Sequence, residues 1–287
     1  MRILPCVLLL GAGCVAPSLL AGQGPSYATP ATRQVVERML AAHGGLVRWR
    51  NAPTIRYHNL FFNSAQAENN PWWVARETID QRTRRAYHQW PLDHALLAHD
   101  GQRVWTVGWR QANYPNFMAL FFYYFVNLPW ITQDSNVRLG PAGPAPLPGQ
   151  AGTYDTVRVT FGPPHLMGRS EHDYFVLYVD RETGLLRAYQ YGIGYGAMLD
   201  LMRVPADATV SGPVLRFHDE FTTVDGLVFP LRMHTTNLTA SRTYGYHAIV
   251  NYSLTDAWDE SRMTMPPNAV VDTSRAERVG RAPEPPR

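Results

Sequence analysis

The chain contains no lysine, and all 26 of its basic residues are arginine. The absence of lysine excludes Schiff-base catalysis, a pyridoxal phosphate anchor and the lysine of a phosphate-binding loop. Charged residues make up only 17% of the chain and the arginines are mixed with acids, so no basic stripe predicts a nucleic-acid partner. Long apolar runs are also absent. After the first 21 residues the longest run covers residues 117–126, whereas a membrane-spanning helix needs about 20 residues.

Cysteine is confined to the first 21 residues, where Cys6 and Cys14 lie. Arg2, an apolar stretch that begins at Val7 and small residues up to Ala21 predict a signal peptide, residues 1–21. The mature chain then has no disulfide, thiol nucleophile or thiolate metal site. Two routes of maturation stay open: cleavage near Ala21, or lipidation of Cys14, which would attach the protein peripherally to a membrane. Both predict an exported protein, in the periplasm or associated with the outer membrane.

Helical signals are limited to the start of the mature chain and to one aromatic segment. Thr29 is a suitable N-cap, Pro30 suits a first helical position and Gly44-Gly45 ends the helical spacing, so we expect a helix between them. From residue 54 onwards, alternating apolar and polar residues predict strands, many of them joined by hairpin signals. Consecutive hairpins indicate an antiparallel meander and a mainly β fold.

The domain boundaries follow from composition. The strand pattern predicts a single β domain over residues 29–265. Residues 140–152 hold four prolines and four glycines without periodicity, which predicts a loop. Residues 266–287 become rich in arginine, glutamate and proline towards their end, which predicts a disordered C-terminal tail.

Aromatic residues are dense, with 15 Tyr, 11 Phe and 8 Trp. Residues 116–126 are almost entirely apolar or aromatic and stop before Pro129, which predicts a short buried helix or a lid. Two interpretations stay open: these side chains fill the core of a curved sheet, or they wall an apolar cavity for an acyl chain. The second gives these candidate ligand-binding residues: Trp72, Trp73, Trp105, Phe121, Phe122, Tyr124, Phe125 and Trp130.

Signatures of metal and cofactor binding are weak. There is no H-E-x-x-H pair, no G-x-S-x-G elbow, and most of the ten histidines are isolated, so we expect neither a metal nor a cofactor. Residues 192–197 match the dinucleotide pattern G-x-G-x-x-A. Because the strand before them belongs to an antiparallel hairpin, the pattern favours a glycine-rich loop.

One acidic residue lies in an unexpected place. Leu215, Phe217 and Phe221 alternate along one predicted strand, and Asp219 interrupts their apolar face. This position predicts a buried, paired carboxylate with a structural role. Together with His218, Asp219 is also the best candidate for a catalytic Asp/His site.

Several motifs resemble one family. The initial helix ends in His43-Gly44-Gly45 and is followed by Trp49, and two turn motifs lie at residues 178–186 (Tyr-Val-Asp-Arg-Glu-Thr-Gly-Leu-Leu) and 224–230 (Val-Asp-Gly-Leu-Val-Phe-Pro). Over residues 32–265 this pattern resembles the outer-membrane lipoprotein carrier (LolA/LolB-like) superfamily. The stretch 121–130 is similar to an uncharacterised group of bacterial envelope proteins within that class.

The resemblance implies an antiparallel incomplete (half) barrel, curled around the N-terminal helix and the short aromatic helix, with a lipid in its concavity. Carriers of this superfamily keep an arginine at the cavity mouth, a role in which the sequence places no arginine here. We therefore expect a non-enzymatic exported envelope protein that binds a lipid or acylated ligand. Two alternatives stay open: an exported hydrolase that uses Asp219 and His218, and a structural accessory protein that binds an envelope protein partner.

Overall fold

The computed structural model describes residues 24–63 and 72–278, so the predicted signal peptide with Cys6 and Cys14 lies outside the described residues. The helices are α1 (Pro30–Ala42), α2 (Leu46–Asn51), α3 (Pro115–Met118), α4 (Phe121–Val126), α5 (Leu128–Ile131), α6 (Gly196–Leu201) and the 3-10 helix η2 (Glu260–Met263). The strands are β1 (Ser26–Tyr27), β2 (Thr54–Asn63), β3 (Trp72–Asp80), β4 (Ala86–Trp90), β5 (Ala95–His99), β6 (Val104–Val107), β7 (Val137–Leu139), β8 (Gly143–Pro146), β9 (Thr153–Phe161), β10 (Tyr174–Asp180), β11 (Leu186–Gly192), β12 (Val214–Val224), β13 (Leu227–Thr236), β14 (Thr243–Ser253) and β15 (Val270–Val271).

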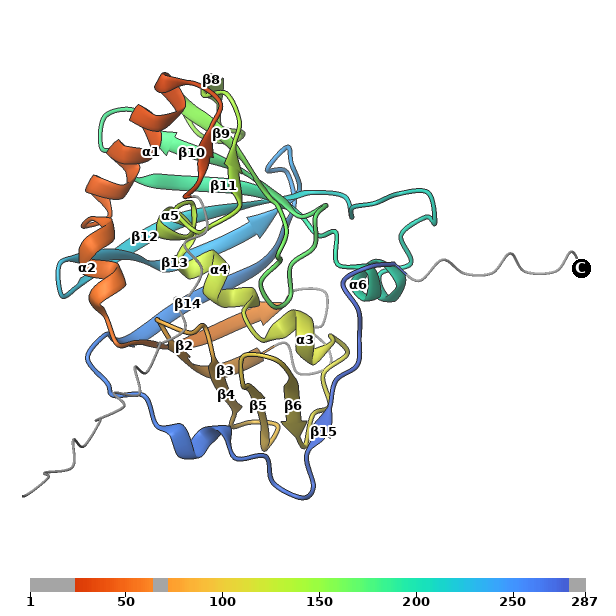
Figure 1. Cartoon of the computed structure of the whole chain (residues 1–287). Coiled ribbons are helices and arrows are strands. Elements are labelled where there is room, and N and C mark those ends of the chain that lie inside the picture. The colour runs from red at the N-terminus through yellow and green to blue at the C-terminus, as the bar shows by residue number, and fades with distance from the viewer. Residues whose placement is uncertain (1–23, 64–71, 279–287) are drawn as a thin grey trace, which may run out of the picture.

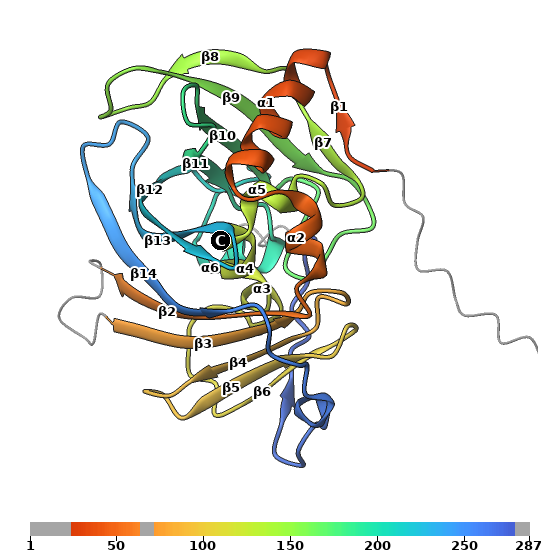
Figure 2. The same cartoon turned by 90° about the vertical axis from the view of Figure 1, so that its left-hand side faces the viewer.

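These strands form one sheet in the order β1-β7-β9-β10-β11-β12-β13-β14-β2-β3-β4-β5-β6-β15, with β8 paired to β9 off this path. Neighbours are antiparallel except for β1 and β7. Within the described residues the two ends of this order do not pair, so the sheet curls without closing (Figures 1 and 2). Helices α1 to α5 lie on its concave side (Figure 2). The predicted mainly β half barrel is confirmed.

Helix α1 begins where its sequence signals place it. The Thr29 hydroxyl accepts a hydrogen bond from the Thr32 amide at 3.1 Å, and Pro30 occupies the first turn, where no amide donor is needed. The chain leaves the helix through Gly44, whose φ is +92°. A Cβ at Gly44 would clash with the Gly226 carbonyl oxygen, so glycine lets the β12–β13 turn pack against the end of the helix.

His43, just after α1, connects this helix end to two strands. Its Nδ1 donates to the Val228 carbonyl oxygen at 2.7 Å, and its Nε2 accepts from the Leu186 amide at 3.0 Å. Both ring nitrogens are used by a neutral imidazole, and burial lowers the pKa of His43 to about 4. The His-Gly-Gly motif therefore fixes α1 to β11 and β13.

The core is divided between the two faces of the sheet. The main cluster lies on the concave side, between the inner face of the sheet, α1 and the segment from α3 to α5. A smaller cluster lies on the outer face of β9 to β12 and comprises Leu147, Tyr154, Tyr178, Ala188, Leu215 and Phe217. Residues 140–152 were predicted to form a loop. They also contain a strand, β8, which pairs with β9, and Leu147 of this segment packs into the second cluster.

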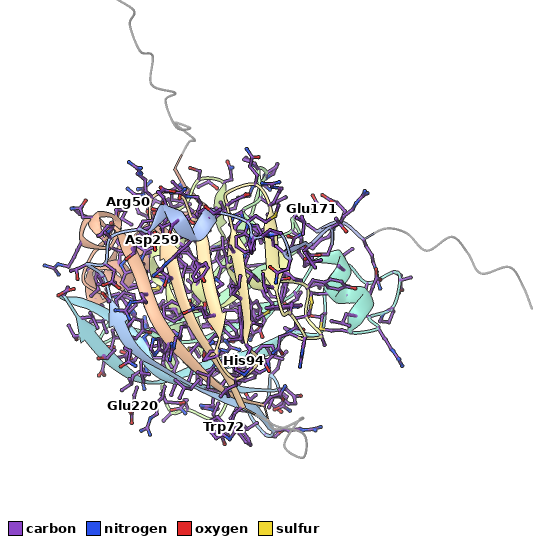
Figure 3. All side chains as sticks on the ribbon, turned by 90° about the horizontal axis from the view of Figure 1, so that it is seen from below. Arg50, Trp72, His94, Glu171, Glu220 and Asp259 are labelled. Atoms are coloured by element: carbon purple, nitrogen blue, oxygen red, sulfur yellow. The ribbon has the colours of Figure 1, made fainter. Side chains whose placement is uncertain are left out.

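Residues 254–278, which we name the C-terminal strap, first cross below the β2–β6 part of the sheet (Figure 3) and, beyond β15, run to α6 (Figure 1). The Thr54 hydroxyl donates to the Asp256 carbonyl oxygen at 2.8 Å, and β15 pairs with β6. Further on, Asp272 accepts from the Asn116 amide at 2.7 Å. The predicted disordered tail is therefore wrong for residues 266–278, which backbone pairing and polar side chains hold in place. Residues 279–287 lie outside the described residues.

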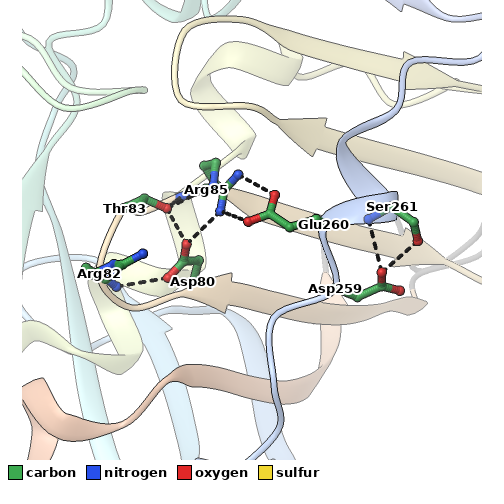
Figure 4. Close-up of polar contacts among 7 residues, drawn as sticks. All are labelled: Asp80, Arg82, Thr83, Arg85, Asp259, Glu260 and Ser261. Atoms are coloured by element: carbon green, nitrogen blue, oxygen red, sulfur yellow. Dashed lines mark hydrogen bonds and ion pairs between the residues drawn. The ribbon is translucent and has the colours of Figure 1, made fainter. Parts of the chain in front are cut away.

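An ion-pair network fixes η2 to the turn between β3 and β4 (Figure 4). The guanidinium of Arg85 donates to both carboxylate oxygens of Glu260 at 2.7 Å and to Asp80 at 3.1 Å. Asp80 also accepts from the Thr83 hydroxyl and lies at the end of β3. Two-point arginine–carboxylate contacts fix orientation as well as distance, so this network places the strap on the sheet.

Candidate ligand-binding site

The concave side of the half barrel is filled by the aromatic segment, residues 115–131. Phe122, Tyr124, Phe125 and Trp130 expose 3% of their surface or less. The segment consists of three short helices because Pro115 and Pro129 start new helical turns, and Asn127, with φ −108°, separates α4 from α5. The expected short buried helix is thus present, as α4 within a broken helical segment.

Besides the contacts of Asn116 with the strap, polar side chains anchor the aromatic segment. The His88 Nε2 donates to the Ala119 carbonyl oxygen at 2.7 Å, and the Tyr123 hydroxyl donates to Gln81 at 2.9 Å. The Trp49 indole donates to Asn127 at 2.8 Å. The segment contributes no strand to the sheet in the described chain, so side chains connect it to its surroundings.

The structure brings six of the eight predicted ligand-binding residues together on the concave side. Phe121 and Trp73 are partly buried there, beside the four buried members of the segment. Phe121 packs on Phe125, with 4.5 Å between ring centroids, and Trp130 lies parallel to Trp49 at 5.9 Å. These six residues therefore form one aromatic interior.

Trp72 and Trp105 do not belong to this interior, and their placement corrects the prediction. Strand alternation turns Trp72 to the outer face, where 51% of its surface is exposed (Figure 3). Trp105 is 2% exposed but lies outside the main core cluster; it pairs with Ala98 in β5 and with Val271 of the strap. The sequence shows that both are in strands but not which face they occupy.

A cavity of about 500 Å³ opens beside the aromatic segment. Its lining comes from the β3–β4 and β5–β6 turns, the segment between β9 and β10, α3 and the strap, and includes Leu120, Met167, Arg169 and Tyr195. The eight predicted residues do not line it, but Arg169 lies over the ring of one of them, Tyr124, at 3.5 Å from the ring centroid.

Arg169 is 8% exposed, and its Nε and Nη2 have no hydrogen-bond partner among the described residues. Burial lowers the pKa of this guanidinium. Asp173 attracts it from a distance, but both Asp173 oxygens accept backbone hydrogen bonds at 2.7 Å, from Ser170 and Gly194. The structure therefore places a buried cation beside the cavity without a direct counter-ion in the part of the chain it describes.

A second buried arginine lies deeper on the concave side. Arg216 is 3% exposed; its Nε donates to the Thr235 hydroxyl at 2.9 Å and its guanidinium lies 4.1 Å from the Phe125 ring centroid. Its Nη1 has no partner among the described residues, nor has the Tyr189 hydroxyl. Each unpaired buried polar group lowers the free energy of unfolding by about 1–3 kcal/mol. Apolar side chains would fill the same space without this loss of stability.

A buried acid adds to this polarity on the opposite wall. The Tyr57 hydroxyl donates to Glu77 at 2.8 Å, and burial raises the pKa of Glu77 to about 8. Asn59, whose side chain also bonds Glu77, accepts from His247 at 3.1 Å. Burial lowers the pKa of His247 well below its ordinary value. At neutral pH this network is therefore largely uncharged.

The Asp/His pair predicted for a hydrolase is not assembled. A bulge between His218 and Phe221 breaks the alternation of β12. His218 points inward, where its Nδ1 donates to the Leu186 carbonyl oxygen at 2.9 Å. Asp219 is exposed on the outer face and binds His234 at 2.8 Å. The carboxylate is paired, as predicted, but it is not buried and its partner is not His218.

The described residues form neither a cluster of metal ligands nor a dinucleotide-binding turn. Among residues 24–63 and 72–278, no three His, Cys, Asp or Glu side chains come together as metal ligands. The glycine-rich residues 192–197 lie where β11 ends and α6 begins, and α6 has only six residues. Added Cβ atoms at Gly192, Gly194 and Gly196 would clash with neighbouring atoms, so these glycines serve close packing.

Sequence reasoning missed Arg169, Arg216 and Glu77. Arg216 carried a signal, because it alternates with the buried Leu215 and Phe217 and so must face the other side of β12. That other side is the concave interior, which only the curl of the sheet reveals. Arg169 lies in an irregular segment next to Ser170 and Glu171, a composition typical of a solvated loop.

The comparisons with known proteins concern the fold. No protein-family model and no curated protein matches the chain. Among solved structures, it is similar to a putative outer membrane lipoprotein-sorting protein domain from Vibrio parahaemolyticus, with 9% identity over 80% of this chain and 96% of that chain and a TM-score of 0.48. It is also similar to a DUF1329 family protein from Desulfovibrio piger, with 11% identity over 83% and 98% of the two chains and a TM-score of 0.47.

A third similar structure is a LolA superfamily protein from Nitrosomonas europaea, with 10% identity over 76% of this chain and 96% of that chain and a TM-score of 0.41. A lipoprotein-sorting domain and a LolA superfamily protein are thus among the similar structures, as the sequence resemblance led us to expect. At these identities and TM-scores the likeness says nothing about ligand or partner. No helix in the described part of the chain is long and apolar enough to cross a membrane.

Proposed function

We propose that this chain is a non-enzymatic exported envelope protein, in the periplasm or at the outer membrane, that binds a lipid or acylated ligand on the concave side of its half barrel. One observation carries the proposal: the concave side is covered by three short helices and not by strands. Helices of four to six residues are unstable on their own. This cover can therefore move without breaking any hydrogen bond of the sheet.

The chemistry of the interior supports an acyl chain as ligand. Phe121, Phe125 and Tyr191 present ring faces and edges to one another, with centroids 4.5 to 6.4 Å apart. An apolar chain that displaces one ring from this set keeps contact with the others, because dispersion and burial of apolar surface are not directional. The cavity at Leu120 reaches the same segment and offers a path of entry.

The proposal is tested by native mass spectrometry of the purified protein and by titration with a fluorescent acyl probe. We expect a bound lipid or a saturable probe signal. Phe121→Ala should weaken probe binding, because Phe121 is the partly buried member of the segment. The matched control is Trp72→Ala, which removes an aromatic ring from the outer face and should leave probe binding unchanged. A wild-type protein that carries no lipid and binds no acyl probe up to millimolar concentration contradicts the proposal.

A second candidate function, an accessory protein that binds an envelope partner, is favoured by the outer face. Strand register places Phe217, His234, Tyr246, Phe62 and Trp72 in one row across five strands. Tyr246 is 54% exposed and Trp72 51%. Exposed tyrosine and tryptophan are frequent at protein interfaces. If Tyr246→Ala and Trp72→Ala abolish capture of an envelope protein while acyl-probe binding stays intact, the accessory function takes precedence.

A further inference from the structure

The cavity beside the aromatic segment has one charged wall and one apolar wall. It occupies about 500 Å³, and its lining includes residues of the segment between β9 and β10 and of α3. Gly168 allows this approach, because with φ +78° it lies against the Phe117 carbonyl oxygen, which a Cβ would contact at 2.8 Å. The apolar wall is formed by Leu120, Leu166 and Met167.

The charged wall is Arg169, which is more than nine-tenths buried. One face of its guanidinium lies on the Tyr124 ring, at 3.5 Å, with the Phe175 ring at 4.8 Å. Aromatic faces stabilise a cation but accept none of its in-plane N–H groups as a carboxylate does. Nε and Nη2, which lie on the same edge of a guanidinium, are both left without a partner in the described chain. This pair of donors matches two oxygens of one carboxylate or phosphate.

The other polar groups around the cavity do not bind these two buried donors of Arg169. The Nδ1 of His165 is buried and unpaired within the described residues. Arg84 already binds Asp134 at 2.9 Å, and Asp173 accepts its two backbone hydrogen bonds. Glu277, at the exposed end of the strap, is the acid among the lining residues. Arg84 and Arg169 are therefore the cations of the lining, and Glu277 is its acid.

We infer that Arg169 binds the anionic head group, a carboxylate or a phosphate, of an amphiphile whose acyl chain lies against the aromatic segment. This inference rests on the proposed function, because it assigns the polar end of the same ligand. The two unpaired N–H groups form a two-point contact with the anion, and Leu120 and Met167 contact the first carbons of the chain. Binding of the anion supplies the counter-ion that Arg169 lacks.

Isothermal titration calorimetry tests the inference. The four probes are oleate, oleyl alcohol, 1-oleoyl lysophosphatidic acid and inorganic phosphate. We expect oleate or the lysophosphatidic acid to bind at least tenfold more tightly than oleyl alcohol, which has the same chain without a charge. The tighter of the two identifies the head group as carboxylate or phosphate. If inorganic phosphate competes with oleate or with the lysophosphatidic acid, the anion position at Arg169 also accepts the free ion. In Arg169→Gln this preference should fall to less than twofold, with the affinity for oleyl alcohol unchanged.

The control variant is Arg158→Gln, which removes an exposed arginine that lies 4.0 Å from the Tyr174 ring centroid and should keep the preference. Arg169→Lys retains the charge without the two-point geometry and should give an intermediate preference, a result that remains accessible if Arg169→Gln does not fold. Equal affinities of the wild type for oleate, lysophosphatidic acid and oleyl alcohol overturn the inference and leave the proposed function standing. Absence of binding by all three acyl probes overturns both.

Discussion

His218 and Asp219 are adjacent in the sequence, yet their side chains lie on opposite faces of β12. His218 is 1% exposed within the concave interior, whereas Asp219 binds His234 on the outer face. Ordinary strand alternation turns these adjacent side chains to opposite faces, so the pair that sequence reasoning joined consists of two independent groups. Their contributions to stability should therefore differ strongly.

We expect His218→Ala to lower the free energy of unfolding by about 2 kcal/mol or more, because it leaves the Leu186 carbonyl oxygen unpaired and a cavity behind. Asp219→Ala should change it by less than about 1 kcal/mol, the range of exposed ion pairs. Denaturant midpoints of the two variants measure this difference. Equal losses would mean that the two side chains do not lie on opposite faces of β12.

His43 should make stability depend on pH on the acidic side. Its pKa is about 4 in the folded protein, below its ordinary value of 6.5, so the folded state binds fewer protons between these values. The contribution of His43 to stability is complete above pH 6.5 and decreases as the pH falls towards 4, by up to about 1.4 kcal/mol per pH unit. Unfolding titrations at several pH values should give a smaller slope for His43→Gln than for the wild type. The exposed His94→Gln variant should keep the wild-type slope.

Glu77 should produce the opposite dependence at higher pH. Burial raises its pKa from 4.5 to about 8, so the folded state binds more protons than the unfolded chain between these values. Its contribution is complete below pH 4.5 and is lost as the pH rises towards 8. Glu77→Gln, which keeps the shape without the charge, should remove this decline and be more stable than the wild type at pH 8. Glu37→Gln, on the exposed side of α1, serves as the control; an unchanged decline in Glu77→Gln would contradict the assignment.

Phe229 should be among the most costly truncations. It is fully buried, stacks on Tyr252 at 4.7 Å and packs on Trp130 at 5.0 Å. Phe229→Ala should cost about 3–5 kcal/mol of unfolding free energy. Phe62→Ala, the same truncation on the outer face, should cost less than half as much. Comparable midpoints for the two variants would show that the register of β2 or β13 is wrong.

Local patterns in the sequence suffice for most of the fold. Thr29, Pro30 and Gly44 mark the ends of α1, and the alternation of Val157 and Val159 marks β9, because these signals depend on neighbours in the chain. The strap was missed because β15 has only two residues, and its contacts depend on Asp272 meeting Asn116 across 156 positions. Such a contact has no local signal.

The site was predictable only in part, for a related reason. The aromatic segment is evident from the sequence, because residues 116–126 are almost entirely apolar or aromatic. This composition also predicts that the segment is buried. The face that Trp72 and Trp105 occupy depends on which side of each strand becomes concave, a property of the whole sheet. Arg169 is buried by segments far from it in the sequence. The residues next to it in the chain therefore do not indicate that it is buried.

The strap also determines when the fold can be completed. Its contacts join residues 54 and 256, and 116 and 272, so the edge strand β6 stays uncovered until almost the entire chain is available. Contacts of such long sequence separation form slowly, because loop closure must precede them. During that interval an unpaired β6 edge can add a strand from another chain. Pairing of residues 270–271 with β6 thus ends the period in which the sheet is open to self-association.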